Sequence, residues 1–264
     1  MVIRHIPFLV LASTLTLAGQ TPVPQQNFTE SRSEMRLQGP IPASDPRQVI
    51  TPELRADIMM ARKMFREAID MYKQAPQDSA IVQNKIGIAY HQLVEMGTAK
   101  KFYEKASKMK PDYAEAINNL GTVHYAQKSH RKAIGYYKKA LKYSPDSASI
   151  HSNLGTAYFA RKNYDMALEE YQLAMKLDPD VFEHRGSHGV LLQERSVDER
   201  AKFHFYLAKS YAKAGNSDRT LLYLRKALEE GFKEKKRVLE EPDFAFIRES
   251  PEFKQLLAME QKVI

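Results

Sequence analysis

The chain has 264 residues, of which 43 % are apolar and 27 % are charged, so it can form a substantial core and is not wholly disordered. It contains no cysteine, which excludes disulfides, thiolate metal sites and cysteine nucleophiles. The formal net charge of +8 favours anionic partners, although a solvated, mildly basic surface explains the same value.

Residues 1–18 have the layout of a secretory signal peptide. Arg4 precedes an apolar run from Ile6 to Ala18, and small residues follow it. The run is shorter than the roughly 20 residues that span a bilayer, which favours a cleaved signal over an uncleaved hydrophobic tail. Gln20 stands where a lipoprotein signal requires cysteine, so no lipid anchor is predicted. We therefore predict export to the periplasm or the cell exterior.

Residues 19–51 are predicted to be a disordered linker. Prolines recur there among glutamine, serine and threonine, and the apolar residues follow no helical or strand period. The folded part of the chain is therefore expected to begin near residue 52.

A period of 34 residues runs through the middle of the chain. The same residue type recurs at this interval in four sets: Gly87, Gly121 and Gly155; Ala99, Ala133 and Ala167; Tyr103, Tyr137 and Tyr171; Pro111, Pro145 and Pro179. Several positions that stay in phase over three copies will not arise by chance. A fixed period of this length indicates a helical solenoid, in which each unit buries its apolar face against its neighbours.

The two clearest copies, "INNLGTVHYAQKSHRKAIGYYKKALKYSP" and "HSNLGTAYFARKNYDMALEEYQLAMKLDP", resemble the consensus of the tetratricopeptide repeat family. The resemblance implies an all-α fold, a right-handed superhelical solenoid of antiparallel helix pairs. The resemblance places a partial first unit at 52–79 and repeats at 80–113, 114–147 and 148–181. An ordered insertion loop follows at 182–200, then a fourth repeat at 201–234, which has Ala208 at the glycine position. Cap helices are expected at the C-terminus, at 235–264.

The small residues at the repeat positions have a packing explanation. A glycine inside a helix costs about 1 kcal/mol relative to alanine, so Gly121 needs a compensating contact. We predict that it lies where the two helices of a repeat cross closely, with Ala133 small for the same reason. Pro145 is predicted to end the second helix, because proline lacks an N–H group and restricts the residue before it.

In this family the first helices of successive repeats line a concave groove, so the resemblance implies a binding surface there. Placing the family's groove positions on this sequence gives the groove residues Asn84, Lys85, Asn118, Asn119, Thr122, Tyr125, Ser152, Asn153, Thr156, Phe159, Phe205 and Lys209. Asn119 and Asn153 share one phase and resemble the asparagine ladder with which some members hold extended peptides, since an amide both donates and accepts hydrogen bonds. The first and fourth repeats carry Lys85 and Tyr206 at that position instead of asparagine. Because asparagine is also the family consensus here, both asparagines have an alternative interpretation as ordinary helix-surface residues.

The histidines are interpreted as structural. Three of them lie at repeat positions that usually hold an aromatic core residue: His124, His151 and His204. His184 and His188 have a spacing that binds zinc on a helix, but the glycines around them disfavour a helix, so no metal site is predicted.

No other pattern indicates catalysis or a cofactor. The sequence has no nucleophile elbow, phosphate-binding loop or dinucleotide fingerprint. The carboxylates of Glu169 and Glu170 are predicted to lie on a solvated helix surface. The chain is therefore not expected to be an enzyme.

Two functions remain open. The first is an exported, non-catalytic module that binds a partner protein or extended peptide in its groove. The second is a structural subunit of a cell-envelope assembly, such as a secretion, pilus or outer-membrane complex, bound through the C-terminal cap or the basic second helices. The basic residues of those helices are Lys100, Lys101, Lys105, Lys108, Arg131, Lys132, Lys138, Lys139 and Lys142. Nucleic acid is not a predicted partner, because no aromatic residues interleave with the basic ones as in a base-stacking surface.

Overall fold

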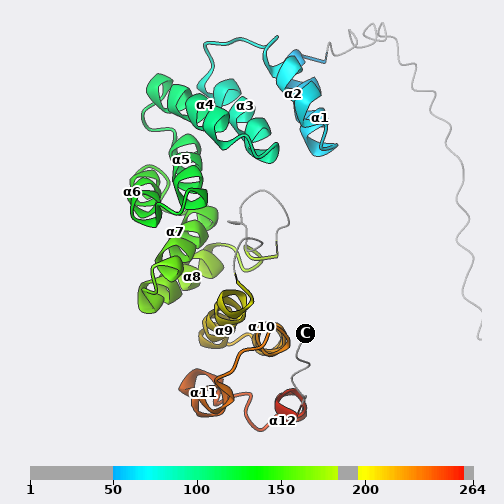
Figure 1. The fold of residues 1–264 in the computed structure, drawn as a ribbon, viewed down its shortest axis with the longest axis vertical. Helices are drawn as coiled ribbons and strands as arrows, with labels where there is room; N and C mark the ends of the chain where they lie inside the picture. Colours follow the sequence, from blue (N-terminus) through cyan, green and yellow to red (C-terminus); the bar gives the residue numbers. More distant parts are fainter. Residues whose placement is uncertain (1–49, 184–195, 259–264) are drawn as a thin grey trace, which may run out of the picture. The chain divides into compact units, whose positions relative to one another are not determined.

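The computed structural model describes residues 50–183 and 196–258, and every regular element within these ranges is helical (Figure 1). The predicted signal peptide, nearly all of the predicted linker, and His184 and His188 lie outside the described residues. None of the helices in the described ranges is long and apolar enough to cross a bilayer.

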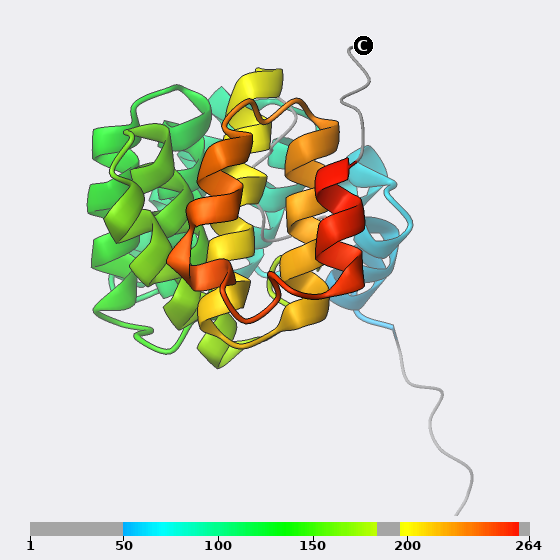
Figure 2. The same cartoon turned by 90° about the horizontal axis from the view of Figure 1, so that it is seen from below.

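Consecutive helices form pairs. In chain order they are α1 (Pro52–Ala61), α2 (Phe65–Tyr72), α3 (Ala80–Gln92), α4 (Met96–Met109), α5 (Ala114–Ala126), α6 (His130–Leu141), α7 (Ala148–Ala160), α8 (Tyr164–Leu177), α9 (Val197–Lys213), α10 (Ser217–Glu229), α11 (Lys235–Glu240), the short 3-10 helix η2 (Pro242–Phe244) and α12 (Pro251–Ala258). Each odd helix from α1 to α9 packs on the next, and the second helix of each pair contacts the first helix of the following pair (Figures 1 and 2). The predicted all-α architecture of helix pairs stacked in sequence order is confirmed.

One turn geometry joins the two helices of every pair. A residue with positive φ follows the first helix: Lys63, Val94, Lys128, Lys162 and Gly215. The next N–H group then donates to a carbonyl five residues back, as from Ser129 to His124 at 2.9 Å. This is the Schellman arrangement, which satisfies carbonyl groups that the helix end leaves without partners.

Residues 52–79, predicted to be a partial first unit, contain a helix pair whose members, of 10 and 8 residues, are shorter than the 13 and 14 residues of α3 and α4. Pro52 does not interrupt a helix: it is the first residue of α1, where its missing N–H group needs no partner. Ala56 and Tyr72 are separated by the same sixteen positions as Gly121 and Tyr137, and both are buried.

The repeated glycines make room for a tyrosine ring. A Cβ atom on Gly87, Gly121 or Gly155 would lie 2.5–2.6 Å from the Cε1 atom of the tyrosine sixteen residues later. Those tyrosines are at most 1 % exposed: Tyr103, Tyr137 and Tyr171. An aromatic ring is thus the nearest group beside each glycine, and at Gly155 the backbone oxygen of Ala167 would also lie 3.1 Å from the added Cβ atom.

The prolines act at the ends of the second helices. α4 ends at Met109 and α8 at Leu177, and the residues that precede Pro111 and Pro179 have extended backbone angles. Proline imposes that conformation on the residue before it, so the helix cannot continue. α6 ends at Leu141, three residues before Ser144, the residue that Pro145 restricts.

The fourth pair begins earlier than the sequence predicts. α9 starts at Val197, inside the predicted insertion loop of 182–200, because Ser196 and Glu199 form a capping box at its N-terminus. Beyond α10, Phe232 stacks on Phe205 with ring centroids 4.5 Å apart. Phe244 and Phe253 of the C-terminal segment are fully buried, which agrees with the predicted capping role.

Candidate functional site

Four asparagine side chains form a continuous line of hydrogen bonds across three first helices. The Nδ2 atom of Asn153 on α7 donates to Oδ1 of Asn118 on α5 at 3.1 Å, and Nδ2 of Asn118 donates to Oδ1 of Asn119 at 3.4 Å. Asn119 then donates to Asn84 on α3 at 3.0 Å, and Asn84 donates to the Tyr113 hydroxyl at 3.5 Å. We call these four asparagines the amide ladder.

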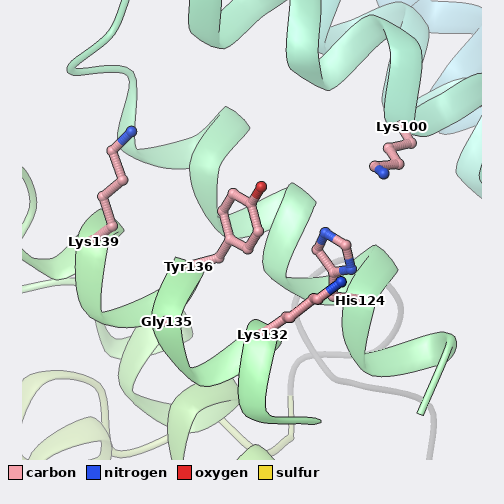
Figure 3. Close-up of a pocket in the computed structure, with 6 residues that line it drawn as sticks. All are labelled: Lys100, His124, Lys132, Gly135, Tyr136 and Lys139. Carbon is pink, nitrogen blue, oxygen red and sulfur yellow. The ribbon is translucent and has the colours of Figure 1, made fainter. Parts of the chain in front are cut away.

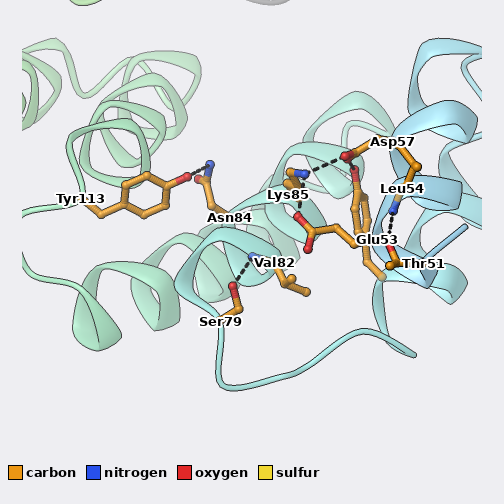
Figure 4. Close-up of polar contacts among 10 residues, drawn as sticks. Thr51, Glu53, Leu54, Asp57, Ser79, Val82, Asn84, Lys85 and Tyr113 are labelled. Carbon is orange, nitrogen blue, oxygen red and sulfur yellow. Dashed lines mark hydrogen bonds and ion pairs between the residues drawn. The ribbon is translucent and has the colours of Figure 1, made fainter. Parts of the chain in front are cut away.

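The end of the ladder at Asn84 and Tyr113 lies beside a charged cluster on the first pair (Figure 4). The Nζ atom of Lys85 lies 2.8 Å from carboxylate oxygens of both Glu53 and Asp57 on α1. Burial alone would lower the pKa of Lys85, but its hydrogen bonds to the two carboxylates outweigh burial and raise the pKa. Lys85 therefore connects α3 to α1 and stays positively charged.

The structure divides the predicted groove residues by accessibility. Six of them are buried: Asn84, Ser152, Asn153, Thr156, Phe159 and Phe205. The half-buried ones near the ladder are Lys85, Asn118, Asn119, Thr122 and Tyr125. The predicted residues thus lie on the first helices α3, α5, α7 and α9, and the buried ones among them offer little surface to a partner.

The third repeat is covered by the fourth pair. The ring of Phe159 on α7 packs edge-on against Phe203 and Tyr206 of α9, with centroids 5.5 and 5.8 Å apart. The hydroxyl of Thr156 accepts a hydrogen bond from Tyr171 and donates to a backbone carbonyl. The accessible part of the predicted surface is consequently centred on α5.

The predicted site residue Lys209 of α9 instead holds the C-terminal segment. Its Nζ atom lies 2.9 Å from Glu241 and 3.6 Å from Asp243, and all three side chains are at most 21 % exposed. Nearby, Arg237 donates to the Tyr206 hydroxyl at 2.9 Å. Sequence reasoning missed these partners because no periodic signal relates α9 to the residues that follow α10.

Two histidines make specific pairs with carboxylates, which corrects their interpretation as packing residues alone. Nδ1 of His151 lies 2.7 Å from Glu170, and Nδ1 of His204 lies 2.7 Å from Glu230. Glu170 is therefore not a freely solvated residue. Burial lowers the pKa of His204, and Glu230 opposes that shift only in part.

Within residues 50–183 and 196–258, no group of three or more histidine and carboxylate side chains is arranged to hold a metal ion. The ladder and its neighbours offer amides, hydroxyls and an already paired lysine. These groups are suited to hydrogen bonding with a peptide backbone.

Family models described as tetratricopeptide repeat match residues 80–113, 97–142 and 118–181. A comparison with curated proteins gives no match. Among solved structures, a crystal structure of MamA is 21 % identical and covers 69 % of this chain and 96 % of its own, with a TM-score of 0.45. MamA from Desulfovibrio magneticus RS-1 is 18 % identical, covering 69 % and 94 %, with a TM-score of 0.46. YrrB, described as "a TPR protein with an unusual peptide-binding site", is 18 % identical, covering 69 % and 86 %, with a TM-score of 0.44.

Proposed function

Because the chain belongs to the tetratricopeptide repeat family, we propose that it is a non-catalytic interaction module that holds an extended segment of a partner protein. Stacked helical repeats present a continuous surface over several units, and such proteins use this surface for binding. The proposed contact surface is the accessible side of α5 around Asn118 and Asn119, with Lys85 of α3 beside it.

The amide ladder is the observation that carries this proposal. Asn118 and Asn119 each use one N–H group and one acceptor site within the ladder. An asparagine amide has two N–H groups and two acceptor sites, so each retains one of both kinds. Both side chains are half-buried, and the ladder holds their orientation. A donor and an acceptor held side by side match the C=O and N–H groups of an extended peptide, and fixing them beforehand reduces the entropy cost of binding.

The ladder proposal predicts a loss of peptide affinity when both central amides are removed. Random peptides displayed on phage are selected on the wild-type chain, and their Kd values are measured with the Asn118→Ala/Asn119→Ala variant. We expect binding at least about tenfold weaker, because each lost hydrogen bond contributes about 1 kcal/mol. Circular dichroism establishes that the variant is still helical.

Asn216→Ala is the matched control. Asn216 caps α10 through a hydrogen bond to the backbone N–H group of Arg219, so the variant also loses an asparagine and some stability. Its peptide affinity should stay within about twofold of wild type. Equal affinity for the double variant and the wild type would contradict binding at the ladder.

We further propose that the module works outside the cytoplasm, because residues 1–18 have the layout of a secretory signal peptide. Expression with the native N-terminus in a bacterial host should yield a mature chain that begins after Ala18, as measured by intact mass. Recovery of the full-length chain in the cytoplasmic fraction would contradict export. The alternative role as a subunit of a cell-envelope assembly stays a prediction from the sequence.

A further inference from the structure

A basic pocket is formed by α4, α5 and α6 and includes no residue of the amide ladder. It is lined by Lys100 of α4, His124 of α5, and Lys132, Gly135, Tyr136 and Lys139 of α6, and it has a volume of about 650 Å³ (Figure 3). The imidazole of His124 is stacked on the Tyr136 ring, with centroids 5.0 Å apart and an angle of 16° between the planes. Gly135 contributes no side chain, which leaves the pocket open along α6.

The polar groups of the pocket are positive or neutral. Glu104 lies beside the pocket on α4, where its oxygen is 3.6 Å from the Lys100 ammonium. Within the described ranges, no carboxylate lies at ion-pair distance from Lys132 or Lys139. His124 is only 7 % exposed, and among the described residues no hydrogen bond to its ring nitrogens is formed.

The spacing of the lysines distinguishes between anionic ligands. Lys132 and Lys139 are seven residues apart on one helix, which separates their backbone positions by roughly 10 Å at 1.5 Å per residue. In an extended segment of the polyproline II type, which has three residues per turn and rises about 3.1 Å per residue, side chains three residues apart lie on one side and are separated by roughly 9 Å. A single small anion would instead require both lysine side chains to bend toward one point. The spacing therefore fits a chain with several carboxylates better than an isolated phosphate.

We propose that this pocket binds an acidic segment of a protein partner. Carboxylates of the segment pair with Lys132 and Lys139 across Tyr136, and Lys100 faces them from α4. The stacked rings of Tyr136 and His124 provide the floor. This surface uses no residue of the amide ladder, so the two proposals can fail independently.

The lysine spacing predicts which peptide the pocket binds and which substitutions weaken that binding. A fluorescein-labelled peptide with glutamate at every third position, and glycine and serine elsewhere, is titrated with the full chain by fluorescence anisotropy at low salt. The glutamate peptide should bind, and the same peptide with glutamine should not. Lys132→Ala/Lys139→Ala should weaken binding about tenfold, from the loss of two ion pairs at exposed lysines.

Lys101→Ala/Lys108→Ala is a closely matched control. These lysines are also seven residues apart on one helix, both are exposed, and neither lines the pocket. Their loss should change the affinity less than about twofold, because it removes only screened, long-range attraction. Equal losses in the two variants would show attraction to the overall positive charge and would overturn the proposal. Binding of inorganic phosphate without binding of the glutamate peptide would also overturn it.

His124 supplies a second, independent readout. Burial and the nearby charges of Lys100 and Lys132 lower its pKa, and Glu104 opposes them in part. A bound carboxylate raises that pKa, so affinity should increase as the pH falls from about 7 to about 5.5. His124→Phe keeps a ring against Tyr136 and should bind with little pH dependence over that range. An unchanged pH profile in this variant would exclude His124 from the site.

Discussion

Replacing Gly121 with alanine is expected to destabilise the chain by about 2 kcal/mol, although alanine is the better helix former. The new methyl group would lie 2.5 Å from Cε1 and 2.7 Å from Cδ1 of Tyr137. That ring is fully buried, so it cannot move away without disturbing the layer between the helices. Overpacking of this kind costs about 1–3 kcal/mol, and a separation this short places it at the upper end, so about 2 kcal/mol remains after the gain of about 1 kcal/mol in helix propensity.

Gly135→Ala is the control for this prediction, because it makes the same chemical change in the neighbouring helix α6. No heavy atom lies within 4 Å of a Cβ at Gly135, so the variant should be more stable by about 0.5–1 kcal/mol. Thermal unfolding followed by circular dichroism compares the two variants with wild type. The variant that combines Gly121→Ala with Tyr137→Leu should lose less stability than the sum of the two separate losses, since the smaller side chain removes the clash. A Gly121→Ala variant as stable as Gly135→Ala would show that the glycine has no packing role.

Lys209→Met is expected to destabilise the chain by about 2–3 kcal/mol and to release the C-terminal segment. The side chains of Lys209, Glu241 and Asp243 are 15 %, 10 % and 21 % exposed. Removing the ammonium group leaves two carboxylates close together with little access to water, and an uncompensated buried charge is costly. Because these three side chains keep some exposure to water, the expected loss of stability is smaller than is typical for a fully buried ion pair.

Lys233→Met serves as the control for the buried lysine. Lys233 lies 3.7 Å from Asp198, but these side chains are 80 % and 68 % exposed. Such a surface pair contributes well under about 1 kcal/mol, so the thermal midpoint should hardly change. Limited proteolysis gives the second readout: residues after Glu240 should be cleaved faster in Lys209→Met than in Lys233→Met. Equal cleavage rates would contradict the role of Lys209 in holding the C-terminal segment.

The periodic features of the fold could be predicted from the sequence because their causes lie within one repeat. Gly121 and Tyr137 are sixteen residues apart, and the turn between their helices has the same geometry in every pair. Pro111 ends a helix through its effect on the residue directly before it. The sequence therefore indicated helix pairs stacked in order.

The first and fourth units show where pattern reasoning reaches its limit. Residues 52–79 are predicted as a partial unit because the spacing between the first two units is shorter than the repeat, yet Ala56 and Tyr72 are buried in one cluster of the first helix pair. In the fourth unit, Lys209 keeps its repeat position, yet its neighbours are Glu241 and Asp243. Only folding brings those carboxylates to α9.

The sequence by itself determined the helix pairs, their order and which residues lie on the first helices, because each depends on interactions within a repeat. Tertiary structure decided which of those residues remain accessible. Phe159 is covered by Phe203 and Tyr206 of α9, and Asn153 is buried within the ladder, whereas Asn118 and Asn119 stay half-exposed. Tertiary structure also brought Lys100, Lys132 and Lys139 together around His124. Accessibility and charge clustering depend on contacts between repeats, and the pattern of one repeat contains no information about them.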